Sequence, residues 1–388
     1  MSGIYLDNAA TSFPKPEYVY KAMDYFMREL GGSPARGSYS KAQESERIVI
    51  KLRSKLCQLL GVSDPTRLLF TFNSTDALNL VLKGFLKPGD HVIVTDVEHN
   101  ALLRPLWKMR QTHNIAVTIV KSNEHGQVSP EDIFKEVTPQ TKLIACVHAS
   151  NVLGTLQPIQ EIGAGCKKRG IAFLVDGSQT AGAYPVDVDA LGIDFFVFTG
   201  HKSLLGPGGT GGVIIQHGLE LDSYREGGNG AHSDHLEQPT GLPERYESGT
   251  PNMLGYAGLL AGVEFIQEQG VHNIRAHELA LNKALMEELQ GIDQVKIYGP
   301  SAEEKVAITS IGFKMLDTSE VGQILGKKFN IMVRTGIHCS PLIHQNIGTK
   351  AQGTVRFSMG WFNTLEEIKK VGDAVREISH AVYGGNRS

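Results

Sequence analysis

Short apolar runs alternate with longer amphipathic stretches from residue 68 to residue 215. The runs are rich in β-branched and aromatic residues, a pattern typical of buried strands, and the stretches between them repeat apolar residues at helical spacing. Such β-α-β alternation predicts a mostly parallel sheet with helices on both faces. The predicted strands are 68–71, 91–95, 115–120, 142–148, 171–175, 195–199 and 213–215, and the predicted helices are 74–85, 101–113, 130–136 and 158–169.

The pattern changes on either side of this alternation. The first residues are polar and contain Pro14 and Pro16, which indicates an extended arm rather than a helix. A long helical stretch over about 253–290 is followed by shorter strands and helices. We therefore predict an α/β fold in which a large domain, residues 17–265, carries a mostly parallel sheet of the seven-stranded type. Residues 1–16 and 266–388 are expected to form a smaller α+β domain.

Several polar residues follow the predicted strands directly or lie in the loops after them. His99, Asn151, Asp176 and Thr199 share this location. In open parallel sheets, ligands bind beyond the carboxyl ends of the strands. These side chains are therefore expected to belong to one site.

One lysine is presented directly after an apolar run. Lys202 follows strand 195–199, and Asp176 ends the run before it. An amine and a carboxylate at neighbouring strand ends can hold opposite ends of one cofactor ring. This favours a Schiff base between Lys202 and pyridoxal phosphate, with Asp176 paired to the pyridine nitrogen. The alternative is a solvated lysine at a strand end.

A phosphate site is predicted where strand 68–71 leads into the next helix. Ser74 and Thr75 open that helix, whose first turn offers free N–H groups, hydroxyls and a positive dipole end. The alternative is a plain N-cap made by Asn73 or Ser74. Residues 206–211 match G-x-G-x-x-G, but they lead into a strand rather than a helix, which excludes a dinucleotide-binding loop.

Other polar side chains near these strand ends suit a flat, charged ring. A neutral imidazole at His99 can stack on a ring and move protons near pH 7. By itself, such a histidine is more often a satisfied surface or core residue. Asn151 and Gln179 carry amides that can donate to a ring oxygen.

The smaller domain contains one cysteine in a suggestive setting. Cys339 lies in a glycine-containing segment beside His338 and a few residues after Arg334. Positive neighbours lower the pKa of a thiol and raise its thiolate fraction, so we expect a reactive cysteine here. Arg356 stands in an otherwise apolar strand and requires an anionic partner, which can be a structural carboxylate or the α-carboxylate of a substrate.

Composition narrows the class of protein. The 388-residue chain is 41% hydrophobic and 20% charged, which is ordinary for a globular protein. Its formal net charge of −3 gives no reason to expect nucleic acid or an anionic membrane as partner. No apolar run is long enough to span a bilayer. The four cysteines are widely spaced, so neither a disulfide framework nor a metal site is expected, and the cytoplasm is the expected compartment.

Several segments together carry a resemblance to a known family. They are YLDNAAT (5–11), SNVLGT (150–155), VDGSQ (175–179), TGHK (199–202), ESGTPN (247–252) and RTGIHC (334–339). In this order they resemble the cysteine desulfurase and selenocysteine lyase family, which are class V aminotransferase-like, pyridoxal phosphate-dependent enzymes of fold type I. The R-x-G-x-H-C form resembles the group II branch of that family.

The resemblance implies a role for each matching residue. The reaction it implies converts L-cysteine to L-alanine, with the sulfur taken as a persulfide on Cys339 and passed to a protein acceptor. Thr250 is expected to reach the cofactor of a partner subunit, which implies a homodimer. The implied catalytic residues are Lys202, Cys339 and His99; the substrate-binding residues are Arg356 and Asn151; and the cofactor-binding residues are Ser74, Thr75, His99, Asn151, Asp176, Gln179, Thr199, His201, Lys202 and Thr250.

The chain departs from the family pattern at two positions, and its region 222–250 looks shorter than in typical group II members. Ala35 stands where a group II enzyme often has histidine, and Ile337 stands where many relatives have a second histidine. These departures leave the sulfur acceptor and the preference between L-cysteine and L-selenocysteine open. The alternative functions are a selenocysteine lyase, a class V transaminase and a non-catalytic cofactor-binding protein that relays sulfur.

Overall fold

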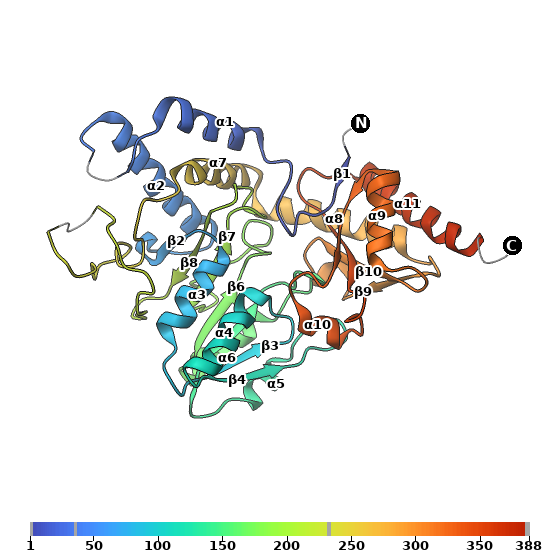
Figure 1. Ribbon diagram of the computed structural model, residues 1–388, viewed down its shortest axis with the longest axis horizontal. Coiled ribbons are helices and arrows are strands. Elements are labelled where there is room, and N and C mark those ends of the chain that lie inside the picture. The colour runs from blue at the N-terminus through green and yellow to red at the C-terminus, as the bar shows by residue number, and fades with distance from the viewer. Residues whose placement is uncertain (1–2, 35–36, 231–233, 385–388) are drawn as a thin grey trace.

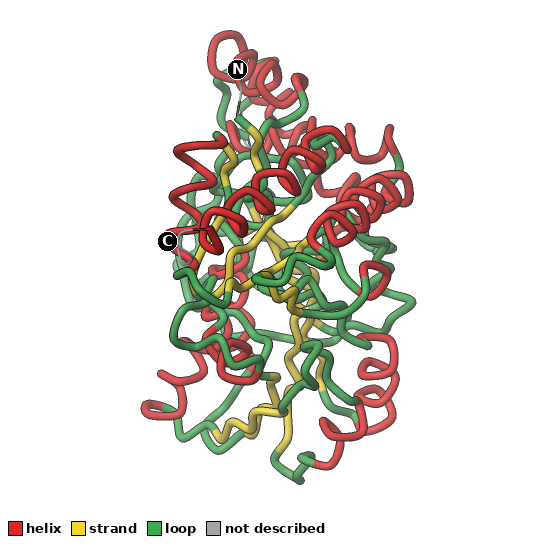
Figure 2. The backbone as a smooth tube through the Cα atoms, turned by 90° about the vertical axis from the view of Figure 1, so that its right-hand side faces the viewer, coloured by secondary structure: helices red, strands yellow, loops and turns green. Residues whose placement is uncertain are grey.

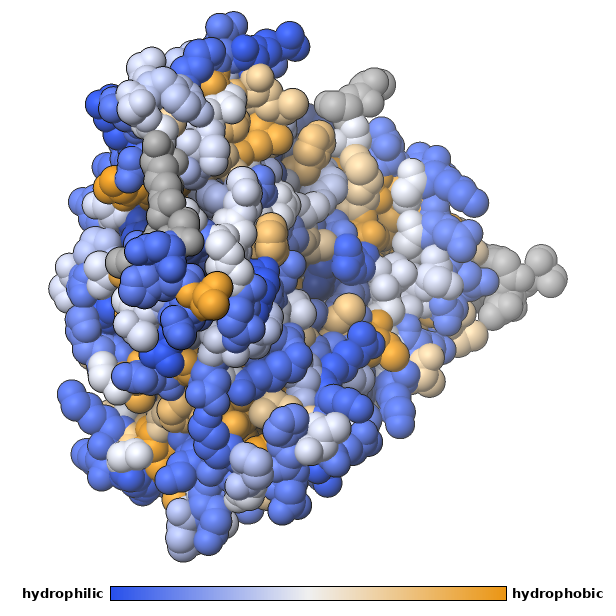
Figure 3. All heavy atoms as spheres, turned by 60° about the vertical axis from the view of Figure 1, so that its left-hand side comes forward, coloured by the Kyte–Doolittle hydropathy of each residue, from blue (hydrophilic) through white to orange (hydrophobic). Residues whose placement is uncertain are grey.

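The structure is a computed structural model that describes residues 3–34, 37–230 and 234–384. Ala35 therefore lies outside the described residues. Figure 1 shows two lobes, with the central sheet in one lobe and the C-terminal elements in the other. The strands run through the interior and most helices lie outside them (Figure 2). Within the described part of the chain, no helix is both long and apolar enough to span a membrane, and the face in Figure 3 is mainly hydrophilic.

The central sheet has seven strands in the order β2-β8-β7-β6-β5-β3-β4. Strand β8 runs antiparallel to both of its neighbours, β2 and β7, and the remaining pairs are parallel. The exception has a simple cause, because a short loop without a helix joins β7 to β8. The predicted mostly parallel sheet is confirmed. Its strands are β2 (Leu68–Thr71), β3 (His91–Thr95), β4 (Ala116–Val120), β5 (Thr141–Val147), β6 (Ala172–Asp176), β7 (Phe195–Thr199) and β8 (Gly211–Ile215).

Helices cover both faces of this sheet, as predicted. One apolar cluster joins the sheet to α3 and α4, and a second joins it to α2, α6 and α7. Helix α1 lies against α7 and continues into a short π-helical turn (Figure 1). The helices of this lobe are α1 (Glu17–Tyr25), the π turn Phe26–Leu30, α2 (Ser40–Leu59), the 3-10 turn Pro65–Arg67, α3 (Ser74–Phe85), α4 (Asn100–Thr112), α5 (Pro130–Lys135), α6 (Ile159–Arg169) and α7 (Met253–Gln269).

The second lobe is built on a four-stranded antiparallel sheet, ordered β12-β13-β10-β9. Helices α8, α9 and α11 contribute to the apolar cluster on this sheet. Its elements are α8 (Val271–Leu289), β9 (Val295–Tyr298), the 3-10 turn Ala302–Glu304, β10 (Ile308–Phe313), α9 (Thr318–Phe329), β11 (Ile331–Met332), β12 (Arg334–Gly336), α10 (Pro341–Asn346), β13 (Thr354–Ser358) and α11 (Leu365–Gly384).

The helical stretch predicted over 253–290 is divided in two. Gly270 separates α7 from α8 with a φ of 81°, a backbone conformation that other residues rarely adopt. Helix α7 packs in the first lobe and α8 mainly in the second. The division into a large domain 17–265 and a small domain made of 1–16 and 266–388 remains our proposal, and this change of packing partner supports a boundary in this region.

The N-terminal arm belongs to the second lobe at its start. Strand β1 (Ile4–Tyr5) pairs in parallel with β11, and Leu6 is fully buried against the C-terminal lobe. The residues after Asp7 then reach the turn that follows β7 in the first lobe, where Ser12 N–H donates to the carbonyl of His201 at 3.0 Å. The arm therefore connects the two lobes beside the predicted site.

Candidate active site

Lys202 lies in a tight turn after β7. The turn is closed by hydrogen bonds from Leu205 N–H to the Lys202 carbonyl at 2.9 Å and from Gly206 N–H to the Gly200 carbonyl at 2.8 Å. Glycine is required at position 200, because a Cβ there would lie 2.0 Å from Thr210 Oγ1. The strand and this glycine together fix where the lysine emerges.

The amine of Lys202 is easier to deprotonate than an ordinary lysine amine. Burial lowers its pKa to about 8; the negative charges of Asp176 and Cys339 oppose this shift, while Arg356 and Arg334 add to it. At pH 7.5 about a quarter of such amines are neutral, against about one in a thousand for an ordinary lysine. Lys202 can therefore act as a nucleophile or a base near neutral pH.

Asp176 ends the adjacent strand β6 and is only 4% exposed. Its Oδ1 accepts hydrogen bonds from the N–H of Ser178 at 3.0 Å and from the Ser178 hydroxyl at 2.5 Å. Its Oδ2 accepts none from the part of the chain that the structure describes. A carboxylate oxygen without a donor, on a residue that is otherwise buried, is suited to a ligand that brings its own N–H.

His99 is the N-cap of α4. Its Nδ1 accepts a hydrogen bond from the N–H of Ala101 at 3.0 Å, so a neutral ring carries its proton on Nε2. Burial lowers the pKa of His99, and the nearby charge of Lys202 lowers it further. A neutral ring held by the backbone in this way can stack on a flat ligand and exchange a proton through Nε2.

Glu98, which the sequence analysis did not single out, is a buried carboxyl next to His99 in the chain. It is 1% exposed, accepts a hydrogen bond from the Thr95 hydroxyl at 2.6 Å, and accepts the N–H of Val147 at 3.1 Å on each oxygen. Val147 pairs with Asp176 across β5 and β6, so Glu98 braces the strand beside Asp176. Burial raises its pKa to about 8. The sequence did offer one indication of Glu98, since this residue directly precedes His99 in the loop after a predicted strand.

The Glu98→Gln variant is expected to remove a pH dependence of stability. Because the folded pKa of Glu98 lies above its unfolded value, the unfolded chain releases this proton first, and stability falls as pH rises from about 5 to 8. The uncharged glutamine has no such proton. The melting temperature should therefore fall less between pH 5 and pH 8 for the variant than for the wild type. Equal losses in the two proteins would contradict a protonated Glu98.

The predicted phosphate ligands have free hydroxyls. Asn73, not Ser74, caps α3, because its Oδ1 accepts the N–H of Asp76 at 2.9 Å. Within the described residues, the hydroxyls of Ser74 and Thr75 make no hydrogen bond, so they remain available to a ligand at this helix start. The capping alternative from the sequence thus holds for Asn73 and leaves the two hydroxyls unused.

Further predicted ligands lie around the Lys202 turn. Thr199 is buried, and its hydroxyl lies 3.5 Å from the Thr210 carbonyl. Burial lowers the pKa of His201 to about 4, helped by the charges of Lys202 and Lys15, so this ring is neutral near pH 7. Gln179 is buried and donates through Nε2 to the carbonyl of Ala9 at 3.0 Å.

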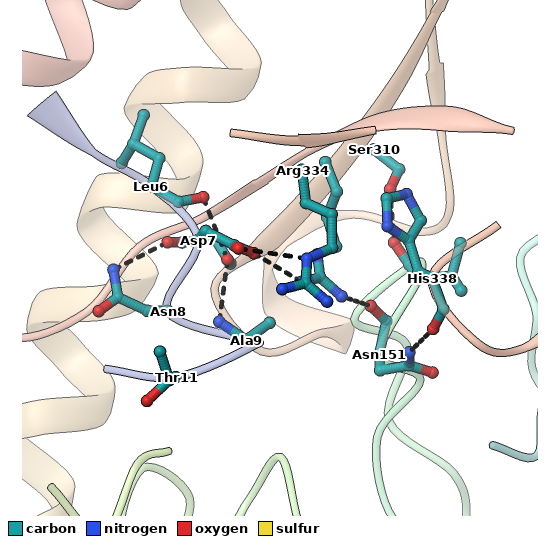
Figure 4. Close-up of polar contacts among 12 residues, drawn as sticks. Leu6, Asp7, Asn8, Ala9, Thr11, Asn151, Ser310, Arg334 and His338 are labelled. Atoms are coloured by element: carbon teal, nitrogen blue, oxygen red, sulfur yellow. Dashed lines mark hydrogen bonds and ion pairs between the residues drawn. The ribbon is translucent and has the colours of Figure 1, made fainter. Parts of the chain in front are cut away.

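The amide of Asn151 holds the cysteine segment. Its Nδ2 donates to the carbonyl of His338 at 2.6 Å, and its Oδ1 accepts the hydroxyl of Ser340 at 2.6 Å. The contact to His338 is drawn in Figure 4. In this arrangement the amide is committed to the loop that carries Cys339, so a contact with a ring oxygen requires an exchange of partners.

Cys339 is the exposed member of the four free cysteines. Its carbonyl accepts the N–H of Asn100 at 2.8 Å, which ties the loop to the start of α4. His338 and Cys339 both adopt left-handed backbone conformations, with φ of 51° and 61°. Such strain in two consecutive non-glycine residues marks a loop that its surroundings hold in place. The loop presents the thiol outward.

The prediction that His338 is a positive neighbour of the thiol is wrong. Its ring points inward, where Nε2 lies 3.0 Å from the Thr354 hydroxyl, and burial lowers its pKa to about 2. His338 is therefore neutral. Lys202 and Arg356 share the neighbourhood of Cys339, because the charge of the thiolate affects the pKa of each, and Arg334 acts on both of these residues.

Arg356 forms an ion pair with a carboxylate of the same chain. It is 2% exposed, its Nη2 donates to Asp7 Oδ1 at 2.9 Å, and its Nη1 donates to the carbonyl of Asn151 at 2.8 Å. The other oxygen of Asp7 accepts Arg334 Nε at 3.2 Å. In Figure 4 the carboxylate of Asp7 faces Arg334, and dashed lines mark its contacts. The structural carboxylate that the sequence left open is Asp7.

Thr250 lies on the surface, in the wall of a cavity of about 330 Å³. Thr71 and Phe72, which precede the start of α3, line the same cavity. The large side chains of Ile50 and Phe72 are 61% and 47% exposed there. Ile337, the second departure from the family pattern, is 40% exposed beside the cysteine loop.

Comparisons with known proteins agree with this arrangement. The class V aminotransferase family model matches residues 4–371. A probable cysteine desulfurase from Methanothermobacter thermautotrophicus is 34% identical over 97% of this chain and 94% of its own length. A cysteine desulfurase from Haloferax volcanii is 30% identical over 96% and 88%.

Solved structures give the same result at the level of the fold. The apo structure of a cysteine desulfurase from Thermococcus onnurineus NA1 is 31% identical, has a TM-score of 0.92, and covers 98% of this chain and 95% of that one. The predicted fold-type I architecture is thereby confirmed. The chain belongs to the class V aminotransferase family, in the group of the cysteine desulfurases.

Proposed function

We propose that this protein is a pyridoxal phosphate-dependent cysteine desulfurase. It converts L-cysteine to L-alanine and takes the sulfur as a persulfide on Cys339. The observation that carries this proposal is the position of an exposed thiol close enough to a buried lysine and a buried arginine for its charge to act on both. A class V fold with a lysine alone is consistent with many reactions of amino acids, whereas a thiol in this place is suited to sulfur transfer.

The chain's own groups fit the cofactor. Lys202 offers an amine with a pKa of about 8, and the largely buried Asp176 offers a carboxylate oxygen without a donor among the described residues. His99 offers a neutral ring, and the hydroxyls of Ser74 and Thr75 are free at a helix start. When bound, pyridoxal phosphate supplies an electron sink that weakens the bonds around the α-carbon of an amino acid. Further predicted cofactor ligands are Asn151, Gln179, Thr199, His201 and Thr250.

Each catalytic group has a task that its environment supports. The neutral amine of Lys202 takes a proton at Nζ and returns it, since its pKa lies near the working pH. His99 can hold or release a proton at Nε2, because Nδ1 is occupied by the backbone of α4. Arg356 and Asn151 lie beside the cysteine loop, where the substrate carboxylate is expected.

The sulfur step conserves atoms and electrons. The thiolate of Cys339 forms a bond to the sulfur of cysteine while the bond between that sulfur and the β-carbon breaks. The electron pair of the broken bond stays with the carbon, which takes up a proton, so alanine leaves and the enzyme keeps a persulfide. Because Cys339 is exposed, the persulfide sulfur can then pass to the thiol of a protein acceptor.

Exposed residues and free thiols support the proposed homodimer and compartment. The exposed Thr250, in a cavity flanked by exposed Ile50 and Phe72, supports a homodimer in which Thr250 reaches the partner's cofactor. All four thiols are free, which supports a reducing compartment such as the cytoplasm. L-selenocysteine is a second possible substrate, because its carboxylate and amine present the same groups to the site.

The test is the release of alanine from L-cysteine. We expect purified protein, loaded with pyridoxal phosphate and supplied with dithiothreitol, to form alanine and sulfide in equal amounts, with the dithiol oxidised to its disulfide. Alanine is measured by chromatography, and L-selenocysteine is assayed in parallel. If cysteine yields no alanine while selenocysteine does, the protein is a selenocysteine lyase; if neither yields any, the desulfurase proposal fails.

A further inference from the structure

Asp7 bridges two arginines that come from different strands of the second lobe. Arg334 lies on β12 and Arg356 on β13, and the two residues pair directly in the antiparallel ladder. Like charges opposite one another in a sheet repel. Asp7 places one oxygen on each, at 2.9 Å from Arg356 and 3.2 Å from Arg334 (Figure 4). The carboxylate thus holds together two cations that would otherwise separate.

Arg356 depends on this carboxylate because it is buried. Its side chain is 2% exposed, and its Nε has no hydrogen-bond partner within the described residues. A buried charge left without a counter-ion is strongly destabilising. Asp7 is therefore the group that allows Arg356 to remain charged beside the cysteine loop.

The backbone around Asp7 fixes where its carboxylate lies. Ser358 N–H donates to the Leu6 carbonyl at 2.8 Å, and Asn8 N–H donates to the Ser358 carbonyl at 3.3 Å, so Asp7 is held along β13. Five residues further on, the Ser12 hydroxyl donates to the carbonyl of Lys202 at 2.8 Å. One short arm therefore connects the arginine pair to the lysine turn.

Arg334 keeps donors to spare. Within the described part of the chain it uses only Nε, on Asp7, and its side chain is 46% exposed. Both of its Nη groups remain free, whereas the unpartnered Nε of Arg356 is buried. Two arginines and one aspartate leave one net positive charge, which suits a single carboxylate.

We infer that Asp7 is a positioning residue that gathers Arg334 and Arg356 into one fork for the α-carboxylate of the amino acid substrate. The inference rests on the proposed function for the identity of that substrate. The segment from Asp7 to Ser12 also connects the two arginines to the turn of Lys202, so it fixes their position relative to that lysine. Substrate carboxylate adds to the free donors and leaves Asp7 in place.

The first test is chemical rescue by a small carboxylate, which requires no turnover. Asp7→Ala removes the counter-ion and leaves space beside two arginines. We expect sodium formate to raise the melting temperature of this variant by about 3–5 °C over sodium chloride of equal ionic strength. The wild type, Asp7→Asn, and the surface control Asp24→Ala, whose partner Arg28 is exposed, should not respond to formate. A response equal to that of the wild type would overturn the inference.

The second test separates positioning from general damage. Asparagine fills the same space as aspartate but can accept from one arginine only, because its amide N–H repels the other. Asp7→Asn is expected to raise KM for cysteine about tenfold or more and to change kcat much less. A KM within twofold of the wild type would overturn the inference. Absence of alanine from the wild type would refute the desulfurase assignment alone, since the formate test does not depend on it.

Discussion

Lys202→Ala is expected to abolish alanine formation, with a loss of at least about a thousandfold. Lys202 emerges from the turn after β7 with a pKa of about 8, and the charge of Asp176 acts on it directly. Among the described residues, the amine of Lys15 is occupied by the Ser12 hydroxyl and the His201 carbonyl, and Lys305 is fully buried.

The variant also tests how the cofactor is held. We expect the wild type to retain its visible absorption after gel filtration and Lys202→Ala to lose much of it, because a covalent link is replaced by contacts alone. Lys51→Ala is the matched control, since Lys51 makes an exposed ion pair with Glu264. In wild-type apoprotein, the rate of cofactor loading should rise with pH and level off above about 8, as the free amine becomes the main form. A rate that continues to rise toward pH 10 would contradict the lowered pKa.

The sequence predicted the sheet and its ligand edge because both depend on local patterns. Apolar runs identify strands, and the polar residues that follow them must lie at one edge if the strands are parallel. Asp176 and Lys202 could be placed together for this reason. The antiparallel direction of β8 could also have been predicted, since the loop before it is too short for the crossover that a parallel pair needs.

Other parts of the site depend on contacts that no local pattern records. Asp7 meets Arg356 across 349 positions of the chain, so its role could not be read from the polar turn in which it lies. His338 is adjacent to Cys339 in sequence, yet its ring is buried against Thr354 while Cys339 is exposed. Adjacency along the chain was therefore a poor guide to electrostatic neighbours.

Cys339→Ser is the prediction that separates this protein from other class V enzymes. Serine preserves the size of the side chain and the hydrogen bond from Asn100 N–H to the carbonyl of residue 339, so the loop should keep its shape. The hydroxyl is a far weaker nucleophile toward sulfur at neutral pH. We expect alanine formation from cysteine to fall at least about a hundredfold, while cofactor absorption and thermal stability stay close to those of the wild type.

The remaining cysteines supply a matched control, and mass spectrometry supplies a direct readout. Cys57, Cys146 and Cys166 are buried, and burial raises the pKa of each thiol, so none should act as a sulfur carrier. After one turnover without reductant, the peptide containing Cys339 should gain the mass of one sulfur atom, and Cys57→Ala should leave this unchanged. Residual activity of Cys339→Ser on selenocysteine alone would mean that selenium leaves without a thiol. Full activity on cysteine would instead show that Cys339 is not the sulfur carrier, because the variant has no thiol at this position. The proposal would then lose the feature of the site that favours sulfur transfer over transamination.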